Sequence, residues 1–350
     1  MENLVYQNFS NINLNDIFFD SLKADYTEFS DWFMKKANEG SSAYVLYNTS
    51  NGIEGFMYLK IEDGEVNDIS PSLPNGKHLK IGTFKFESVG TRRGERFIKK
   101  MFDLAFEFNS DNIYVTVFSK HDYLMNLFQR YGFVIHGSKM TSNGIENVLT
   151  KDMYNTKTDM LENYPMVSSN SRKYLLSIYP DYHTRMLPDS ILNNETYDII
   201  QDVSHTNSIH KIYLCAAHGV QNLRRGDGLI IYRTSDRPGQ AWYRSVITSL
   251  CVVEEVRSIN EFDTLDDFLR YTSAYSVFTE NELVSFYNSK RYPNIIRFTY
   301  NTAFKNRVTR GQLIEEGCIL DERINLLEVS HSNYLKMLGL GNVNERFIIN

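Results

Sequence analysis

HLKIGTFKFESVGTRRGERFIKKMFDLA, residues 78–105, is the stretch that decides the fold of the N-terminal half of this chain. Residues 79–86 carry apolar side chains on both alternating faces, which predicts a strand that is covered on at least one side. From Phe97 to Phe108 the apolar residues recur at helical spacing, which predicts an amphipathic helix. A short segment with two glycines joins the two elements.

The joining segment, residues 88–94, has the small and basic sequence SVGTRRG. The first turn of a helix presents free backbone N–H groups and the positive end of the helix dipole, so it can hold a phosphate. Arg92 and Arg93 lie where a pyrophosphate would need them. Most strand–turn–helix units of this kind bind nothing, so the pattern needs support from the segments that follow.

Composition sets the broad class of the protein. The 350 residues are enough for two domains, and the 42% hydrophobic and 23% charged content is ordinary for a globular protein. The net charge is −6, and neither half of the chain is strongly basic. This argues against binding nucleic acid through bulk electrostatics and leaves local basic patches open.

The three cysteines, Cys215, Cys251 and Cys318, lie far apart and show no metal-ligand spacing. They argue against a zinc site or a disulfide framework and favour a reducing compartment. The N-terminal residues lack the pattern of a secretion signal, and no window approaches the roughly 18 continuous apolar residues of a transmembrane helix. We therefore expect a cytoplasmic protein with no bound metal and no membrane partner.

The predicted elements of the N-terminal half follow one another in a definite order. Residues 12–40 are predicted to be helical, residues 43–61 to form a hairpin around an Asn-Gly pair, and the polar residues 62–77 to connect this hairpin to the organising strand. After the long helix, residues 112–118 form a β-branched run typical of a buried strand. A helix that ends in LFQRYGF, residues 127–133, and a further hairpin complete this half.

This order, the basic glycine turn that opens a helix, and the LFQRYGF ending resemble the GCN5-related N-acetyltransferase (GNAT) family over residues 1–153. The resemblance implies a central mixed sheet flanked by helices, with acetyl-CoA as cofactor. It implies that the backbone of the turn binds the pyrophosphate. The implied cofactor-binding residues are Val89, Gly90, Arg92, Arg93, Gly94, Glu95, Arg96 and Phe128.

The sequence departs from the family pattern at four positions. Thr91 stands where Arg or Gln is usual, and Arg96 stands where a small residue is usual. A bulky Arg96 either crowds the phosphates or binds them through its guanidinium group. Phe128 replaces the Tyr that often serves as general acid, and His121 replaces a frequent Asn. Phe128 has no proton to give to a departing thiolate.

An amine must be neutral when it attacks a thioester, so a general base is useful. The candidate catalytic residues are Glu87, at the end of the organising strand, and His121, at the end of the next strand. Their alternative interpretations are a solvated strand-end carboxylate and a residue near a helix N-cap. Tyr123 and Tyr131 are candidate substitute acids, each with a core or surface role as the alternative.

The second half, residues 173–350, follows a polar stretch, residues 154–172, that is predicted to be a linker. Many short strands with interleaved helices predict an α+β fold, and residues 241–255 are predicted to form one long strand. The run LRRGDGLIIYR, residues 223–233, resembles the strand entry of PUA-like barrels, which include ASCH and EVE modules. That resemblance implies a small β-barrel and a partner that is RNA or a modified nucleobase.

A basic and aromatic set lies within and just after the same run. We expect its members to surround one end of a sheet, where arginines pair with phosphates and aromatic rings stack on bases. The alternative is a solvated rim with one aromatic residue in the core. The predicted substrate- or nucleic-acid-binding residues are Arg224, Arg225, Arg233, Trp242 and Arg244.

Together these features predict an acetyl-CoA-dependent N-acetyltransferase domain joined to a PUA-like barrel. The leading hypothesis is acyl transfer to an amine carried by an RNA-related substrate such as an aminoacyl-tRNA. A second hypothesis is a degenerate acetyltransferase fold that binds nucleic acid or regulates without catalysis. A third is acetylation of a small amine or a protein. The sequence leaves a homodimer open.

Overall fold

The computed structural model describes residues 3–87, 93–187 and 208–349, and it divides into two compact units, Met1–Asn163 and Tyr164–Asn350. The division falls inside the stretch predicted as a linker. Leu161, in the first unit, and Met166 and Val167, in the second, are buried. The linker prediction is therefore wrong for these residues, because their apolar side chains pack into the units.

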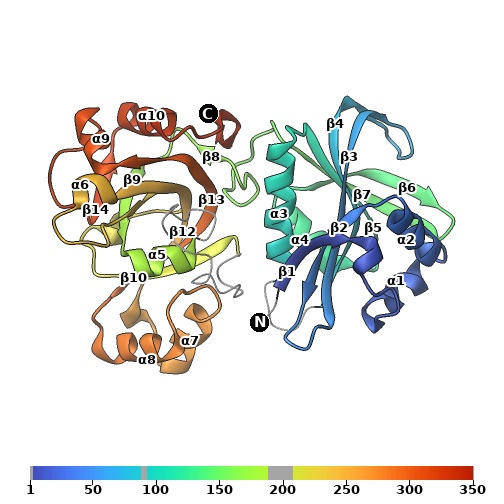
Figure 1. The fold of residues 1–350 in the computed structure, drawn as a ribbon, viewed down its shortest axis with the longest axis horizontal. Coiled ribbons are helices and arrows are strands. Elements are labelled where there is room, and N and C mark those ends of the chain that lie inside the picture. Colours follow the sequence, from blue (N-terminus) through green and yellow to red (C-terminus); the bar gives the residue numbers. More distant parts are fainter. Residues whose placement is uncertain (1–2, 88–92, 188–207, 350) are drawn as a thin grey trace. The chain divides into compact units, whose positions relative to one another are not determined.

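The first unit is built on one seven-stranded sheet with the order β1-β2-β3-β4-β5-β7-β6 (Figure 1). Its neighbouring strands are antiparallel except for the parallel pair β4 and β5. The mixed sheet and the order of elements agree with the prediction. The strands are β1 (Asn3–Asn8), β2 (Ser42–Tyr47), β3 (Ile53–Val66), β4 (Leu73–Phe86), β5 (Asn112–Phe118), β6 (Val134–Thr141) and β7 (Gly144–Asp152).

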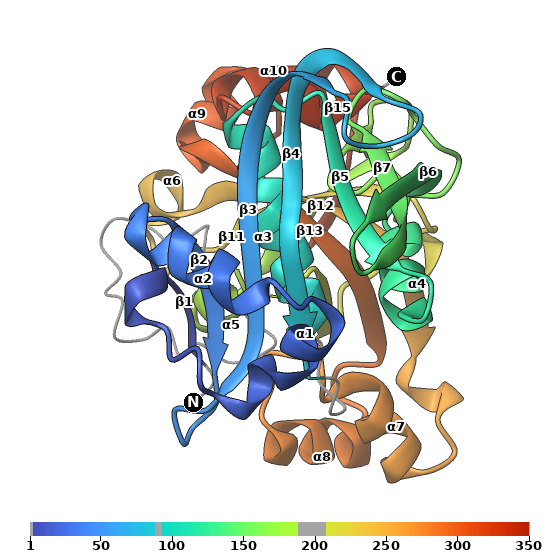
Figure 2. The same cartoon turned by 90° about the vertical axis from the view of Figure 1, so that its right-hand side faces the viewer.

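Helices cover both faces of this sheet. Figures 1 and 2 show α1 (Asp20–Asp25) and α2 (Phe29–Asn38) on one face and α3 (Arg93–Glu107) on the other, with α4 (Asp122–Arg130) on the side of α3 in Figure 1. Under α1 and α2 lies a core that is mainly aromatic. Its fully buried members are Phe9, Phe19, Ala43, Val45 and Phe56.

The predicted helical region, residues 12–40, is interrupted twice. Two short 3-10 helices, η1 (Phe9–Asn11) and η2 (Ile17–Phe19), precede α1, and Asp16 caps η2 through its side chain. Residues 26–28 form the loop between α1 and α2. Helical periodicity is a correct guide to the buried face but not to this loop.

The parallel pair β4 and β5 separates part-way along its length. The two strands pair with each other from His78 and Asn112 to Ile81 and Val115. Beyond these residues they continue to Phe86 and Phe118 without pairing to each other. A divergence of adjacent strands opens the sheet at their carboxyl ends. The organising strand therefore supplies one wall of the opening.

The polar residues 62–77 are not a simple connection, as predicted, but belong largely to the long hairpin of β3 and β4, each 14 residues in length. The end of this hairpin returns to the sheet at β6. Ser70 N and Ser138 N each donate to the other residue's carbonyl oxygen, at 2.8 and 2.9 Å. This contact brings Asp68 to the side of β6.

The second unit contains a six-stranded sheet with the order β10-β13-β12-β11-β9-β14, in which β9 and β11 are parallel and the other neighbours antiparallel. A two-stranded sheet joins β8 and β15. The strands are β8 (Val167–Ser168), β9 (Lys173–Ile178), β10 (His210–Cys215), β11 (Gly228–Arg233), β12 (Val246–Ser258), β13 (Asn294–Thr309), β14 (Leu326–Val329) and β15 (Ile348–Ile349).

Helices and turns are interleaved with these strands, as predicted for an α+β unit. They are α5 (Pro180–Met186), η5 (Val220–Asn222), α6 (Ala241–Arg244), η6 (Ile259–Glu261), α7 (Leu265–Thr272), α8 (Glu280–Ser289), α9 (Arg310–Glu315), α10 (His331–Leu340) and η7 (Glu345–Phe347). Helix α6 replaces the start of the strand predicted over residues 241–255. The shifts in register along β12 bend the sheet. Within the described residues, β10 and β14 are its edges, so closure into a barrel is not observed there.

No helix in the described ranges is long and apolar enough to cross a membrane.

Candidate functional site

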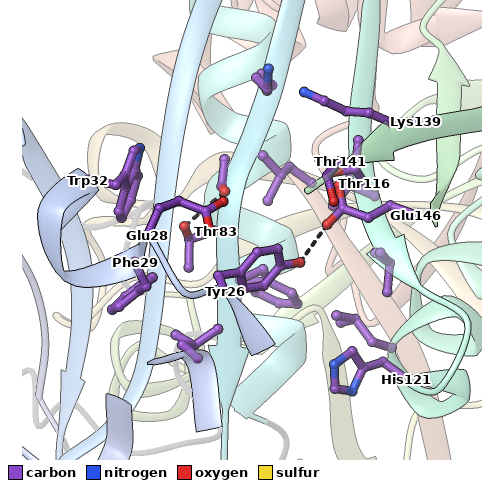
Figure 3. Close-up of a pocket in the computed structure, with 18 residues that line it drawn as sticks. Tyr26, Glu28, Phe29, Trp32, Thr83, Thr116, His121, Lys139, Thr141 and Glu146 are labelled. Carbon is purple, nitrogen blue, oxygen red and sulfur yellow. Dashed lines mark hydrogen bonds between the residues drawn. The ribbon is translucent and has the colours of Figure 1, made fainter. Parts of the chain in front are cut away.

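A cavity of about 290 Å³ lies where β4 and β5 diverge in the first unit (Figure 3). Its walls come from the α1–α2 region, from β4, from β5 and the start of α4, and from the β6–β7 hairpin. The lining residues are Leu22, Tyr26, Glu28, Phe29, Trp32, Lys80, Ile81, Gly82, Thr83, Phe84, Val115, Thr116, Val117, His121, Leu124, Lys139, Thr141 and Glu146.

Hydrogen bonds join the α1–α2 loop to the β6–β7 hairpin beside the cavity. The Tyr26 hydroxyl donates to Glu146 Oε1 at 2.6 Å, as drawn in Figure 3. Asn143 Nδ2 donates to both carboxylate oxygens of Glu28, at 3.0 and 2.8 Å. These contacts join residues more than 100 positions apart and fix one wall of the cavity.

The charges of three carboxylates act on the Tyr26 hydroxyl. Burial raises the pKa of Tyr26 far above its usual value, and the hydrogen bond to Glu146 and the charges of Glu146, Asp25 and Glu28 raise it further. Tyr26 therefore acts as a neutral hydrogen-bond donor, because its anion would face negative charge on several sides.

His121 lines the cavity at the end of β5 and is held by a carboxylate. Its Nε2 lies 3.0 Å from Asp25 Oδ2, and Lys120 also binds Asp25. Burial opposes ionisation of Asp25, but the hydrogen bonds from Lys120 and His121 outweigh it, so the pKa of Asp25 lies below its usual value. An imidazole that donates from Nε2 keeps Nδ1 as a proton acceptor.

The register of the sheet brings His121 and Glu146 to the same region. Glu146 pairs with Phe118, the last residue of β5, and His121 follows three positions later. The Tyr26 ring lies 5.2 Å from the Phe118 ring. Figure 3 shows His121 and Glu146 on the same side of the cavity.

The opposite side of the cavity is apolar. Phe29 and Trp32 of α2 lie with their rings 5.6 Å apart, and Figure 3 shows both beside the cavity. Aliphatic residues Ile81, Val115 and Val117 line the opening between the strands. The cavity thus joins a carboxylate-rich side to an aromatic and aliphatic side.

Two lysines also line the cavity, and each has a carboxylate partner from the β3–β4 hairpin. Lys139 Nζ lies 2.6 Å from Asp68, and Lys80 Nζ lies 3.9 Å from Asp68 and 3.7 Å from Glu62. Their charges are therefore balanced by residues that do not line the cavity.

Of the predicted catalytic residues, the structure brings only His121 to the cavity. Glu87 is 48% exposed, lies 3.5 Å from Lys85 and does not line the cavity. Glu87 follows the last residue of β4, and its role as the base stays a prediction. Tyr131 is fully buried in the core, whereas the Tyr123 ring lies 6.4 Å from the His121 ring.

The predicted cofactor-binding residues lie around the start of α3. Val89, Gly90 and Arg92 fall outside the described residues, and Arg93 begins α3 without a described side chain. Gly94 packs so closely that an added Cβ would lie 2.8 Å from the Phe86 ring and 2.9 Å from Leu127. The helix start is thereby held against the end of β4.

The side chains of Glu95, Arg96 and Phe128 are buried, and their predicted contact with the cofactor stays a prediction. Arg96 is 1% exposed, and Glu95 lies 3.5 Å from Arg130. Phe128 is 0% exposed and packs between Phe84 and Phe133, with ring separations of 5.5 and 5.0 Å. Phe128 belongs to the aromatic core because it lies on the inner face of α4.

The predicted basic and aromatic set of the second unit does not lie at one sheet end. Arg224 and Arg225 precede β11, whereas Arg233 ends it, and a six-residue strand spans about 20 Å. Arg233 is also 2% exposed, so it is not a surface residue.

The two other members of that set lie in α6, after the end of β11. Trp242 packs against the backbone of Gly311, and Arg244 pairs with Asp236. The structure thus divides the set between the two ends of the strand.

Sequence reasoning missed Asp25, Tyr26, Glu28, Asn143 and Glu146. The available signal was the polar sequence DYTE, residues 25–28, which interrupts the apolar periodicity between α1 and α2. Nothing in the sequence linked it to Glu146. Among the described residues, no group of three or more His, Cys, Asp or Glu side chains is arranged to hold a metal ion.

No protein-family model and no curated protein matches this sequence. Similar solved structures include the NatC complex bound to Gag peptide and CoA, with 16% identity and a TM-score of 0.30. The match covers 43% of this chain and 98% of the NatC chain. Ard1 from Thermoplasma volcanium has 15% identity and a TM-score of 0.33. The match covers 43% of this chain and 97% of the Ard1 chain.

A third similar structure is a mutant form of the ASCH protein of Zymomonas mobilis. It has 9% identity and a TM-score of 0.32. The match covers 48% of this chain and 95% of the ASCH chain. At identities this low, a likeness fixes neither the substrate nor the reaction of this chain.

Proposed function

We propose that the first unit is an acetyl-CoA-dependent N-acyltransferase that acetylates an amine bound in the cavity. The observation that carries this proposal is the separation of β4 and β5 beyond Ile81 and Val115. It opens the sheet between the start of α3, where the resemblance to the GNAT family implies the cofactor, and a cavity with a carboxylate-held histidine.

The start of α3 fits a pyrophosphate in part. A 15-residue helix begins directly after the basic turn, and the close packing of Gly94 fixes the position of its first turn. Val89, Gly90, Arg92, Arg93 and Gly94 would hold the phosphates, chiefly through backbone N–H groups. Bound acetyl-CoA supplies a thioester carbonyl that an amine can attack.

In this proposal His121 takes the proton from the attacking amine at Nδ1. Asp25 holds the ring through Nε2 and stabilises the imidazolium that forms. Positioning of the amine in the cavity supplies a further part of the acceleration. The departing thiolate takes a proton from Tyr123 or from water, because Phe128 has none to give.

The finer hypothesis of an RNA-carried acceptor such as an aminoacyl-tRNA also remains a proposal. Its support is the residue types of the basic and aromatic set in the second unit, whereas the division of that set between the two ends of β11 counts against a single binding surface. The acceptor screen should therefore begin with small amines that fit the cavity and include a charged tRNA as a separate arm.

Calorimetric titration of acetyl-CoA into the full chain tests the cofactor. We expect micromolar binding that is lost in the charge-reversed variant Arg92→Glu/Arg93→Glu. Gly94→Glu is a poorer test, since its Cβ alone would disturb Phe86 and Leu127. A transfer assay that follows CoA release with a panel of amines tests the reaction. Absence of acetyl-CoA binding would overturn the proposal and favour the non-catalytic alternative.

A further inference from the structure

Glu146 is a buried carboxylate that faces the cavity and belongs to no ion pair among the residues that the structure describes. It is 3% exposed, and within the described ranges its side chain accepts a hydrogen bond from the neutral hydroxyl of Tyr26 at 2.6 Å. Lys139 is its cross-strand neighbour, but the ammonium group of Lys139 lies on Asp68 instead. A buried anion without a counter-charge is costly, so this site favours a cation from a ligand.

Glu28 is a second carboxylate that lines the cavity, and Figure 3 shows it near Phe29. Asn143 binds its two oxygens through a neutral amide, so the charge of Glu28 is solvated but not balanced. The other carboxylate nearby, Asp25, is already paired with Lys120 and His121. In the part of the chain that the structure describes, Glu28 and Glu146 therefore give the cavity its residual negative charge.

The reacting amine cannot supply the missing charge. It must lose its proton, to His121 in the proposed mechanism, before it attacks the thioester. The carboxylates Glu28 and Glu146 would then stay unbalanced throughout the reaction. A second ammonium group on the same molecule would balance them.

The space between the two ends of such a molecule is apolar. Ile81, Phe84, Val115, Val117 and Leu124 line the cavity between the strands and at the start of α4. Methylene groups would pack here without an unmet hydrogen bond. A cavity of about 290 Å³ limits the bound part to a small molecule or one short chain.

We infer that the acceptor is an alkyl diamine, whose distal ammonium group binds Glu146 and Glu28 while its other amine is acetylated beside His121. This inference rests on the proposed function and names the substrate class of the same cavity. Glu146 is then the residue that distinguishes diamines from monoamines. The reaction forms one amide bond, breaks the thioester, and passes the proton of the amine to His121.

The probes are 1,4-diaminobutane and n-pentylamine, which match in chain length and differ in the distal ammonium group. Calorimetric titration of each into the full chain without an acyl donor measures recognition apart from chemistry. We expect the diamine to bind roughly 10- to 100-fold more tightly, the range for a charged hydrogen bond. Glu146→Gln should remove most of this difference, whereas Glu107→Gln, an exposed glutamate on α3, should keep it.

The outcomes separate the inference from the proposed function. Preferential diamine binding with no acetyl transfer would support the acceptor site and contradict the transferase. Transfer to both amines with equal kcat/KM would support the transferase and overturn the diamine inference. Equal binding of the two amines by the unmodified protein would overturn it also, whether or not Glu146→Gln folds.

Discussion

The hydroxyl of Tyr26 donates a 2.6 Å hydrogen bond to Glu146 across 120 positions of sequence. Tyr26 lies in the loop between α1 and α2, and Glu146 lies near the start of β7. This bond closes one side of the cavity and fixes the orientation of its buried carboxylate. Under the proposed function it therefore connects the geometry of the loop to the recognition of the acceptor.

Tyr26→Phe is expected to raise the KM for the amine acceptor roughly 10- to 100-fold, since a hydrogen bond to a charged group contributes roughly 1.5–3 kcal/mol. The kcat should change little, because Tyr26 does not transfer the proton in the proposed mechanism. Steady-state kinetics with the acceptor varied at saturating acetyl-CoA measures both constants. Tyr6→Phe, which changes an exposed tyrosine of β1, is the matched control. A fall in kcat with KM unchanged would instead place Tyr26 in the chemical step.

His121→Asn is expected to lower kcat for acetyl transfer by about 100-fold, the lower limit for loss of a general base. Asp25→Asn should have a smaller effect, because it removes the group that holds the ring and not the proton acceptor. Acetyl-CoA binding should be unchanged in both variants, which calorimetry would verify. His331→Asn, in the second unit, serves as the control. Unchanged kcat in His121→Asn would exclude histidine as the base and leave direct deprotonation by water.

The order of elements in the first unit was predictable from the sequence because the signals are local. Apolar periodicity identified β4, α3 and β5, and Gly132 marked the end of α4. The cavity was not predictable, because it depends on sheet order. Strand β7 lies between β5 and β6, and only this arrangement places Glu146 beside the end of β5.

The positions of two sets of predicted site residues have a similar origin. Glu87 ends the organising strand, but that position does not tell whether a side chain enters the cleft. Arg225 and Arg233 are close in sequence, yet an extended strand carries them to opposite ends of the sheet. Proximity in sequence is a poor guide to proximity in space wherever a strand lies between two residues.

Gly132→Ala is expected to destabilise the first unit by more than about 2 kcal/mol. Gly132 has φ +84°, and an added Cβ would lie 2.1 Å from the carbonyl oxygen of Glu162, so both strain and a backbone clash result. Gly226→Ala isolates the first effect, because Gly226 has φ +91° but no atom within 4 Å of the added Cβ. It should cost about 1–2 kcal/mol. Urea denaturation would measure the free energy of unfolding of both variants. Equal decreases in the two variants would show that the clash at Gly132 relaxes without cost.

Lys151 predicts a pH dependence of stability in the same region. Its Nζ donates to the carbonyl oxygens of Tyr131 and Glu162 at 2.7 and 2.6 Å. Burial lowers the pKa of Lys151 to about 7, although the charge of Glu162 acts in the opposite direction. In the unfolded chain the pKa of a lysine is about 10.4. Between these two pKa values the unfolded state binds more protons than the folded state, so the free energy of unfolding should rise with pH. Below about pH 7 both states hold the proton, and the free energy of unfolding should no longer depend on this group.

The rise should approach 1.4 kcal/mol for each pH unit in the middle of this window. Lys151→Met removes the titrating group and should remove that slope from the transition of the first unit. Lys173, whose pKa burial lowers to about 8, adds a slope of the same sign in the second unit. The difference in free energy of unfolding between Lys151→Met and the unmodified protein, measured at pH 7, 8 and 9, therefore isolates the contribution of Lys151. The control is Lys35→Met, which changes an exposed lysine. A difference that stays constant across these pH values would mean that Lys151 keeps its proton in the folded state, held as a cation by the two carbonyl groups.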